Sequence, residues 1–252
     1  MDDTLRIMTM NCARGARAPV PPAFFGRAAI TRNIDAIATS IDALHPDVVA
    51  LQEVDRRRFQ EDQVDQVARI AAGAHLEHTA FGAHRSLPRR GLHHGTALLS
   101  RTPIRDACSR AFRTTSLDPK GWVQGTLAPA ALGASAVDVV SVHLDPFTPW
   151  TRRAQIATLQ RALSPRVRPL VVAGDMNAAW GKDGRGDVAR LAQALDLHAW
   201  EPTEPLDTYP SGHPWRRIDW ILLSPELQFT SYATVPGAIS DHRGVVADVV
   251  LR

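Results

Sequence analysis

Short runs rich in Val, Ile and Leu recur along this chain and are separated by turn residues, which is the pattern of β-strands. The runs cover Leu5 to Met10, Asp47 to Gln52, Thr96 to Ser100, Val137 to His143, Leu170 to Ala173, Ile218 to Leu223 and Gly244 to Leu251. Strands outnumber helices, and several follow one another directly. Because this order differs from a regular strand–helix alternation, we expect strand-rich layers covered by helices on the outside.

Three segments between these runs have helical patterns. The first is an amphipathic helix before His45-Pro46, with an apolar face made of Ile30, Ile34, Ile37, Ile41 and Leu44. The second has Thr148 as a candidate N-cap and Pro149 as its first helical residue. A shorter helix is expected from Asp187 to Leu195. Pro-rich Ala18 to Phe24 and basic Arg85 to His94 are expected to be long loops.

The chain has 252 residues, of which 44% are hydrophobic, so it can bury one substantial core. No repeat or linker divides it, and we predict a single domain over residues 1–252. No apolar run approaches membrane-spanning length, and the beginning lacks a signal-peptide pattern, so we expect a cytoplasmic protein with no transmembrane segment. The two cysteines, Cys12 and Cys108, are expected to be buried free thiols. The net charge of +3 fits a phosphorylated partner without requiring one.

The tetrad Gly174-Asp175-Met176-Asn177 follows the apolar run that ends at Ala173. Glycine lets the backbone approach a ligand, aspartate supplies charge for a divalent ion or for water, and asparagine offers a donor and an acceptor. These residues can hold a phosphate and a metal. They also fit a strand that ends in an ordinary Asx turn, and the tetrad alone does not separate the two interpretations.

Other predicted strands also end in, or begin beside, polar side chains that suit catalysis. These side chains are Asn11, Glu53, His143, Asp219, Asp241 and His242. Polar residues at one edge of a sheet can converge on a single crevice. We therefore expect them to meet the tetrad there.

Such a set suits the hydrolysis of a phosphoester. Attack by water builds negative charge on the phosphoryl oxygens, so the site needs a hard cation with oxygen ligands, for which Glu53 is suitable. Asp175 and the two histidines can handle protons and donate to the phosphoryl group, and Asp219 can orient His242 through a ring nitrogen. The alternatives are a salt bridge from Glu53 to one of Arg56 to Arg58, and a core position for His143 bonded to backbone.

Seven motifs follow one another along nearly the whole chain: Asn11, Leu51-Gln52-Glu53-Val54, Gly95-Thr96-Ala97-Leu98-Leu99-Ser100, Val142-His143-Leu144-Asp145, Gly174-Asp175-Met176-Asn177, Arg217-Ile218-Asp219-Trp220 and Ser240-Asp241-His242. Their ordered combination resembles the endonuclease/exonuclease/phosphatase superfamily. This superfamily includes pancreatic-type deoxyribonucleases, abasic-site endonucleases, neutral sphingomyelinases and inositol-polyphosphate phosphatases. The resemblance implies an α/β (α+β) fold like that of deoxyribonuclease I, a four-layer sandwich of two packed, mostly antiparallel sheets flanked by helices.

The resemblance also implies which residues bind the metal and the phosphate. Glu53 is expected to be the principal ligand of Mg²⁺, for which Mn²⁺ is a possible substitute. Asn11 is expected beside it as a metal or phosphate ligand, and Asp241 is expected to act through the water shell of the metal. Asn177 is expected to hold a phosphoryl oxygen, and His143 to donate to a nonbridging or leaving oxygen.

For the proton transfer, the resemblance implies that Asp175 positions or deprotonates the attacking water. His242, oriented by Asp219, is implied to be a base or a charged stabiliser of the transition state. Mechanisms in the family differ on which of Asp175 and His242 takes the proton, so this role is assigned to the pair. Ala13 stands where abasic-site endonucleases carry an acidic residue, and His143 where they tend to use tyrosine, so the pattern is nearer the deoxyribonuclease and sphingomyelinase branches.

These observations predict an Mg²⁺-dependent phosphodiesterase that uses direct attack by water. Its substrate is a small-molecule, lipid-linked or nucleic-acid phosphoester, and no stable protein partner is implied. A nuclease acting on DNA or RNA is the alternative, and a non-catalytic phosphate-binding scaffold is a further one. A serine hydrolase is disfavoured because the chain has no Gly-x-Ser-x-Gly elbow.

Overall fold

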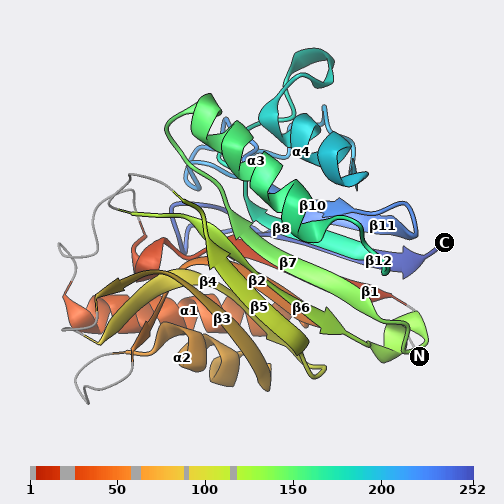
Figure 1. Ribbon diagram of the computed structural model, residues 1–252. Coiled ribbons are helices and arrows are strands. Elements are labelled where there is room, and N and C mark those ends of the chain that lie inside the picture. Colours follow the sequence, from red (N-terminus) through yellow and green to blue (C-terminus); the bar gives the residue numbers. More distant parts are fainter. Residues whose placement is uncertain (1–3, 18–25, 58–63, 88–90, 114–117) are drawn as a thin grey trace.

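The computed structural model describes residues 4–17, 26–57, 64–87, 91–113 and 118–252, which form two packed six-stranded sheets (Figure 1). Sheet A has the order β11-β12-β1-β2-β4-β3. Its strands are β1 (Leu5–Asn11), β2 (Val48–Arg57), β3 (His78–Leu87), β4 (Leu92–Ser100), β11 (Leu227–Thr234) and β12 (Val245–Leu251). Sheet B has the order β5-β6-β7-β8-β10-β9. Its strands are β5 (Arg105–Ala111), β6 (Gly121–Leu127), β7 (Val137–His143), β8 (Leu170–Asp175), β9 (His198–Ala199) and β10 (Asp219–Leu223).

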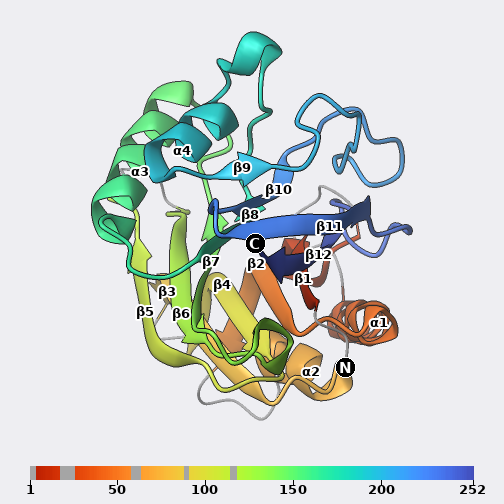
Figure 2. The same ribbon diagram turned by 90° about the vertical axis from the view of Figure 1, so that its right-hand side faces the viewer.

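The helices cover the outer faces of the two sheets, α3 and α4 above and α1 and α2 below in Figure 1; Figure 2 shows the same layers from the side. Their bounds are α1 (Arg27–Leu44), α2 (Gln66–Gly73), α3 (Pro149–Leu163) and α4 (Asp187–Leu195). The predicted four-layer sandwich is therefore confirmed. The N-cap of α3 is also confirmed, because the hydroxyl of Thr148 accepts a hydrogen bond from the Thr151 backbone N–H.

Each sheet contains a parallel strand pair whose connection includes a helix. β1 and β2 pair in parallel and are joined through α1, and β7 and β8 pair in parallel and are joined through α3. Parallel neighbours end at the same edge of a sheet, so His143 and Asp175 are register partners at the ends of β7 and β8. The corresponding edge of sheet A faces them, because Asn11 Nδ2 donates to Asp175 Oδ2 over 2.9 Å.

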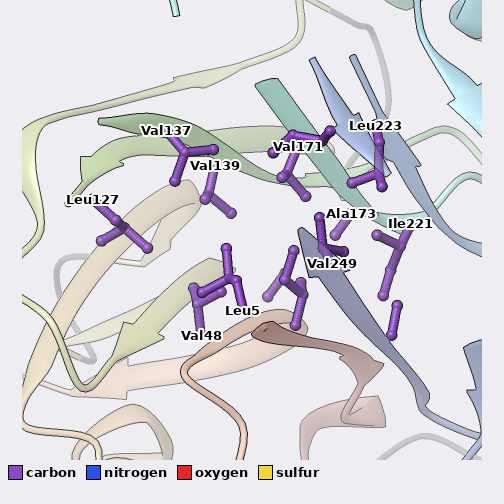
Figure 3. Close-up of a cluster of buried hydrophobic side chains, with 14 of the residues drawn as sticks. Leu5, Val48, Leu127, Val137, Val139, Val171, Ala173, Ile221, Leu223 and Val249 are labelled. Atoms are coloured by element: carbon purple, nitrogen blue, oxygen red, sulfur yellow. The ribbon is translucent and has the colours of Figure 1, made fainter. Parts of the chain in front are cut away.

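The main core lies between the two sheets, as the side chains in Figure 3 show. Alternate residues of the central strands point to opposite faces, and both faces are covered. On β7, Val139 packs in the core between the sheets, while Val140 packs in the cluster beneath α3 and α4. This double burial explains why the central strands are continuous apolar runs in the sequence rather than alternating ones.

Several sequence-based expectations about elements were wrong or incomplete. Much of Arg85 to His94 is not a loop, because β3 continues to Leu87 and β4 begins at Leu92; only residues 88–90 lie outside the described residues. The expected elements did not include β3, β5, β6, β9, β11 or α2, and β5 shows why: its sequence RDACSRA is exposed throughout and has no apolar pattern. Cys108, on that strand, is exposed rather than buried.

The remaining expectations at this level have different outcomes. Cys12 is buried, as expected. The expected loop from Ala18 to Phe24 lies outside the described residues. Within the described part of the chain, no helix combines the length and the apolar character needed to cross a bilayer. The cytoplasmic location and the single domain stay predictions.

Candidate active site

Asp175, at the end of β8, uses its two carboxylate oxygens differently. Oδ1 accepts a hydrogen bond of 2.8 Å from the Asn177 backbone N–H, which is the contact of an Asx turn. Oδ2 lies 2.9 Å from Asn11 Nδ2, 3.4 Å from His143 Nε2 and 3.8 Å from His242 Nε2. The Asx turn of the tetrad is therefore present, and its phosphate and metal roles stay predictions. The turn fixes one oxygen so that the other faces the residues from neighbouring strands.

Gly174 is needed because β8 approaches β7 closely before it delivers Asp175. A Cβ atom at this position would lie 1.9 Å from the Val142 carbonyl oxygen, and φ is +154°. Real Cβ atoms do not come this close to backbone, so any other side chain would displace the strand end. The glycine thus controls the position of the carboxylate that follows it.

Glu53 reaches the site through a β-bulge in β2. Leu51 pairs with Ala97 and Val54 with Gly95, so two residues of β2 oppose one residue of β4. Glu53 itself has φ of +49°, which turns its side chain away from the regular alternation. Its Oε1 lies 4.0 Å from His143 Nε2. The bulge therefore aims Glu53 at the end of sheet B, a placement that the strand pattern alone does not predict.

The ion-pair partner of Glu53 is Lys120, a residue outside the expected set. Lys120 Nζ lies 3.1 Å from Glu53 Oε1 and 3.0 Å from Asp118 Oδ2. Arg56, one of the expected alternatives, lies 3.8 Å from Asp65 instead. Burial raises the pKa of Glu53, but the charges of Lys120 and Arg14 outweigh this, and the pKa lies below its usual value. Glu53 is therefore an ionised carboxylate.

His242 and Asp219 form the predicted pair. His242 Nδ1 lies 2.9 Å from Asp219 Oδ2, which also accepts a hydrogen bond of 2.5 Å from the Thr208 hydroxyl. The ring of Tyr209 packs on the imidazole, with 4.8 Å between centroids. With Nδ1 directed to Asp219, Nε2 of His242 points towards Asp175. This arrangement fixes the orientation of the imidazole.

His143 and Asn177 contact each other through the ends of their side chains. Asn177 Nδ2 donates to the Leu144 carbonyl oxygen over 3.0 Å and lies 3.1 Å from His143 Nε2. Burial holds the pKa of His143 well below its usual value, and the charge of Lys120 adds to this shift. The ring is neutral, and Nε2 is the acceptor for the Asn177 amide. His143 is thus not a core histidine bonded only to backbone.

Asn11 and Asp241 have roles in the structure that differ from simple metal ligation. Asn11 Oδ1 accepts from the Ala13 backbone N–H over 2.9 Å, while its Nδ2 orients Asp175. Ser240 donates to the Asn11 carbonyl oxygen over 2.7 Å and lies 3.3 Å from Asp241 Oδ1. Burial raises the pKa of Asp241, while the charge of His242 opposes the rise. The metal and phosphate roles of both residues stay predictions.

Asp175 and His242 have clearly different pKa values. Burial raises the pKa of Asp175 to about 7, with Asp219 adding to the rise and His242 opposing it. Burial lowers the pKa of His242, but the charges of Asp219 and Asp175 outweigh it and raise the pKa to about 10. His242 is therefore a cation at neutral pH, next to a carboxyl group that titrates near neutrality.

Carboxylates at two places in the site could bind a divalent cation. One ligand atom each from Asp175, Asp219 and His242 lie within 4.8 Å of one another, but His242 is cationic and already bonded to Asp219, which opposes a metal there. Glu53 is a single ionised carboxylate, and the Lys120 ammonium lies against its Oε1. A hard metal ion could bind this oxygen in place of the ammonium.

Sequence reasoning missed three residues of the site: Lys120, Thr208 and Tyr209. Lys120 did carry a signal, because this chain has 29 Lys and Arg residues and only two of them, Lys120 and Lys182, are lysines. A compact ammonium in a chain that otherwise uses arginine marks a position with a specific requirement. Thr208 and Tyr209 lie in an irregular segment without a motif, and their contacts to Asp219 and His242 arise only in the folded chain.

A two-sheet sandwich with carboxylates and histidines at its strand ends is the architecture of metal-dependent phosphoester hydrolases. A model of the Endonuclease/Exonuclease/phosphatase family matches residues 8–242, so the chain belongs to this family. Its members are hydrolases that act on phosphoester bonds. The resemblance predicted from the ordered motifs is thereby confirmed.

Individual relatives are more distant. The uncharacterized protein YbhP of Escherichia coli (strain K12) is 26% identical over 267 residues, covering 98% of this chain and 97% of the relative. A solved endonuclease/exonuclease/phosphatase from Beutenbergia cavernae DSM 12333 has a TM-score of 0.74 at 24% identity, covering 98% of this chain and 72% of that one. A mannosyl-6-phosphatase from Bacteroides thetaiotaomicron VPI-5482 has a TM-score of 0.73 at 13% identity, covering 98% and 100%. These solved structures share the fold.

Proposed function

We propose that this protein is a divalent-metal-dependent phosphodiesterase that hydrolyses its substrate by direct attack of water. The observation that carries the proposal is the environment of Asp175 Oδ2, which faces Asn11, His143 and His242 within 3.8 Å. A carboxylate, a neutral imidazole and an imidazolium around one point can handle the proton of water and the charge of a phosphoryl group. Their geometry argues against a scaffold without activity.

The metal would be held by Glu53, with Asn11 and Asp241 as the further predicted ligands. Mg²⁺, or Mn²⁺ in its place, would polarise a phosphoryl oxygen there. The ionised state of Glu53 supports this assignment.

In this proposal Asp175 accepts the proton of the attacking water. Its pKa of about 7 is matched to neutral pH, which is the condition for an efficient general base. His242 is already protonated at that pH and stabilises the negative charge that builds on the phosphoryl oxygens. Asp219 keeps this imidazolium charged and oriented. The proposal thus assigns the role of base to Asp175 and the role of cation to His242, whereas the sequence assigned the proton transfer to the two residues together.

Asn177 and His143 would contact the phosphoryl oxygens in this mechanism. In the structure, His143 Nε2 accepts from Asn177 Nδ2, so the two side chains orient each other. Binding of the substrate would redirect the Asn177 amide to a phosphoryl oxygen. His143 would donate to such an oxygen as the neutral tautomer that carries its proton at Nε2.

A substrate panel tests the function. Bis(p-nitrophenyl) phosphate, p-nitrophenyl phosphate, single-stranded and duplex nucleic acids, and phospholipid vesicles are incubated with Mg²⁺, with Mn²⁺ and with a chelator. We expect hydrolysis of diesters that stops with the chelator and returns with Mg²⁺. Three results would overturn the proposal: turnover that is unchanged by the chelator, faster hydrolysis of the monoester than of the diester, or phosphate binding without any turnover. A steep loss of activity with rising salt on nucleic acid would identify the nuclease alternative.

A further inference from the structure

The Lys120 ammonium lies between two carboxylates at the place where a metal ion would bind Glu53. Lys120 is 9% exposed, and its Nζ is 3.1 Å from Glu53 Oε1 and 3.0 Å from Asp118 Oδ2. A buried ammonium needs such partners because it has lost its water. Lys120 and the predicted metal therefore compete for the same carboxylate oxygen.

Lys120 lines one pocket together with residues of the candidate active site. Its lining includes Lys120, Glu53, His143 and Arg14. Arg14 lies 2.9 Å from Asp118 Oδ2, so two cations, Lys120 and Arg14, contact carboxylates at this pocket. A divalent cation at Glu53 would add two positive charges beside them. The added positive charge favours the binding of an anion.

We propose that Lys120 is a substrate-binding residue that contacts the phosphoryl group, and that Asp118 holds it in the pocket when Glu53 binds the metal. This inference rests on the proposed function, because it assumes that a metal binds at Glu53. Without metal, the ammonium neutralises Glu53. With metal, the ammonium leaves Glu53 but stays beside Asp118, and its free N–H donors are directed to a nonbridging oxygen. Metal binding and substrate binding are thereby coupled through one side chain.

The alternative hypothesis, that Lys120 and Glu53 form an ion pair with a structural role only, predicts a different result. In that case removal of the ammonium disturbs the site, and metal and phosphate both bind more weakly. If Lys120 instead competes with the metal and then binds the phosphoryl group, its removal strengthens metal binding and weakens phosphate binding. The two affinities must therefore change in opposite directions.

The test variant is Lys120→Met, which keeps the length of the side chain and removes its charge. Mn²⁺ affinity is measured by electron paramagnetic resonance without phosphate, and inorganic phosphate affinity by calorimetry at saturating Mg²⁺. We expect the variant to bind Mn²⁺ several-fold more tightly than the wild type. It should bind phosphate about 10- to 100-fold more weakly, which is the usual effect of losing one charge-assisted hydrogen bond. Lys182→Met, at the other lysine, which is exposed, is the matched control and leaves both affinities unchanged.

Thermal unfolding supplies a second measurement that needs no turnover. The variant leaves Glu53 without its ammonium, so Mg²⁺ should raise its midpoint more than that of the wild type. If Lys120→Met does not fold, Lys120→Gln replaces it under the same criteria. Parallel weakening of both ligands, or no change in either, would overturn the inference. Because binding is measured directly, a wild type that binds metal and phosphate but hydrolyses nothing would refute the proposed function and leave this test valid.

Discussion

Asp175 shows at the residue scale how one side chain serves both fold and chemistry. Its Oδ1 closes the turn to Asn177, and its Oδ2 faces Asn11 and two histidines. An amide keeps the shape of the side chain but has no second oxygen and no negative charge. Substitution by asparagine therefore separates the two tasks. His242 is similar, since its orientation depends on Asp219 and its charge on both carboxylates.

We predict that Asp175→Asn and His242→Asn each lower kcat on an activated phosphodiester by about 10²- to 10⁴-fold, the usual contribution of a general acid or base. The double variant should lose little more than either single one, because the two residues act on the same proton and charge. Asp183→Asn, at an exposed position, is the control. Turnover within a few-fold of the wild type would refute the catalytic roles.

Asp175→Asn should fold normally. Burial raises the pKa of this carboxyl group, which means that its ionised form is unfavourable in the folded protein, and asparagine removes that charge. Chemical denaturation should show a free energy of unfolding no lower than that of the wild type by more than about 1 kcal/mol, the size of an ordinary point substitution.

The pH dependence of kcat/KM should be bell-shaped. The rising limb should have its midpoint near pH 7, where Asp175 becomes ionised, and the falling limb near pH 10, where His242 loses its proton. Because its pKa is raised, protonation of His242 also stabilises the folded protein. This stabilisation is complete below pH 6.5, the ordinary pKa of histidine, and is lost as pH rises through about 10.

Asp219→Asn is the variant that tests this assignment. Removal of the carboxylate lowers the pKa of His242, so the falling limb should move to lower pH. The rising limb should also move to lower pH, because Asp219 adds to the raised pKa of Asp175. The profile is measured from pH 5 to 11 with an activated phosphodiester. A falling limb that does not move with Asp219→Asn would show that another group controls it.

At the scale of elements, the site depends on two irregular features of otherwise regular strands. The bulge of β2 turns Glu53 into the site, and the close approach of β8 to β7 at Gly174 places Asp175. Both features use backbone geometry that an ordinary strand residue does not adopt. They position Glu53 and Asp175, to which the proposed function assigns the metal and the attacking water.

We predict that Gly174→Ala destabilises the protein by about 1–3 kcal/mol, the typical cost of forcing an extra group into a packed region. The new Cβ would meet the Val142 carbonyl oxygen at 1.9 Å, so the end of β8 must move and carry Asp175 with it. Activity should therefore fall even where the variant is fully folded. Gly212→Ala, where a Cβ has open space, is the control. Equal midpoints and equal activity for both variants would contradict this account of β8.

At the scale of the whole molecule, the two sheets share one core and unite the two halves of the site. Leu5 and Val48 of sheet A and Val139 and Ile221 of sheet B belong to the same buried cluster (Figure 3). Neither sheet can bury this inner face without the other. The position of Asn11 against Asp175 therefore depends on the packing of the sheets.

Unfolding should accordingly be a single cooperative transition, as expected of one domain. Ile221→Ala, at a fully buried position, should lower the free energy of unfolding by about 2–5 kcal/mol through lost contacts and a cavity. Val167→Ala, at a side chain that is 86% exposed, should change it by less than about 0.5 kcal/mol. Fluorescence and circular dichroism are followed in denaturant, and transitions that do not coincide would argue for two units.

The sequence predicted much of the fold where the signal is local. Thr148 and Pro149 marked the start of α3 because capping involves residues three apart. The central strands were found because burial on both faces makes them continuously apolar. β5 was missed because an exposed edge strand such as Arg105–Ala111 does not need an apolar face.

The candidate site was predicted as a set but not as an arrangement. Asp219 beside His242 and the facing ends of β7 and β8 follow from motifs whose order is visible in the chain. The partner of Glu53 does not, because Lys120 lies 67 positions away and comes close only through the bulge of β2 and the packing of the sheets. The sequence alone predicted a metal at Glu53, with a nearby arginine as the alternative partner.

The sequence by itself therefore determined which chemical groups stand at the strand ends, since alternation, caps and turn residues act over a few positions. Only the tertiary structure decided that Asp175 Oδ2 faces Asn11 and two histidines, and that Lys120 lies against Glu53. The physical reason is that these contacts join segments far apart in the chain. Asn11 belongs to sheet A, His143 and Asp175 belong to sheet B, and Lys120 and His242 lie outside the strands. Their distances, burial and pKa values depend on how two layers pack, and no local pattern in the chain encodes that packing.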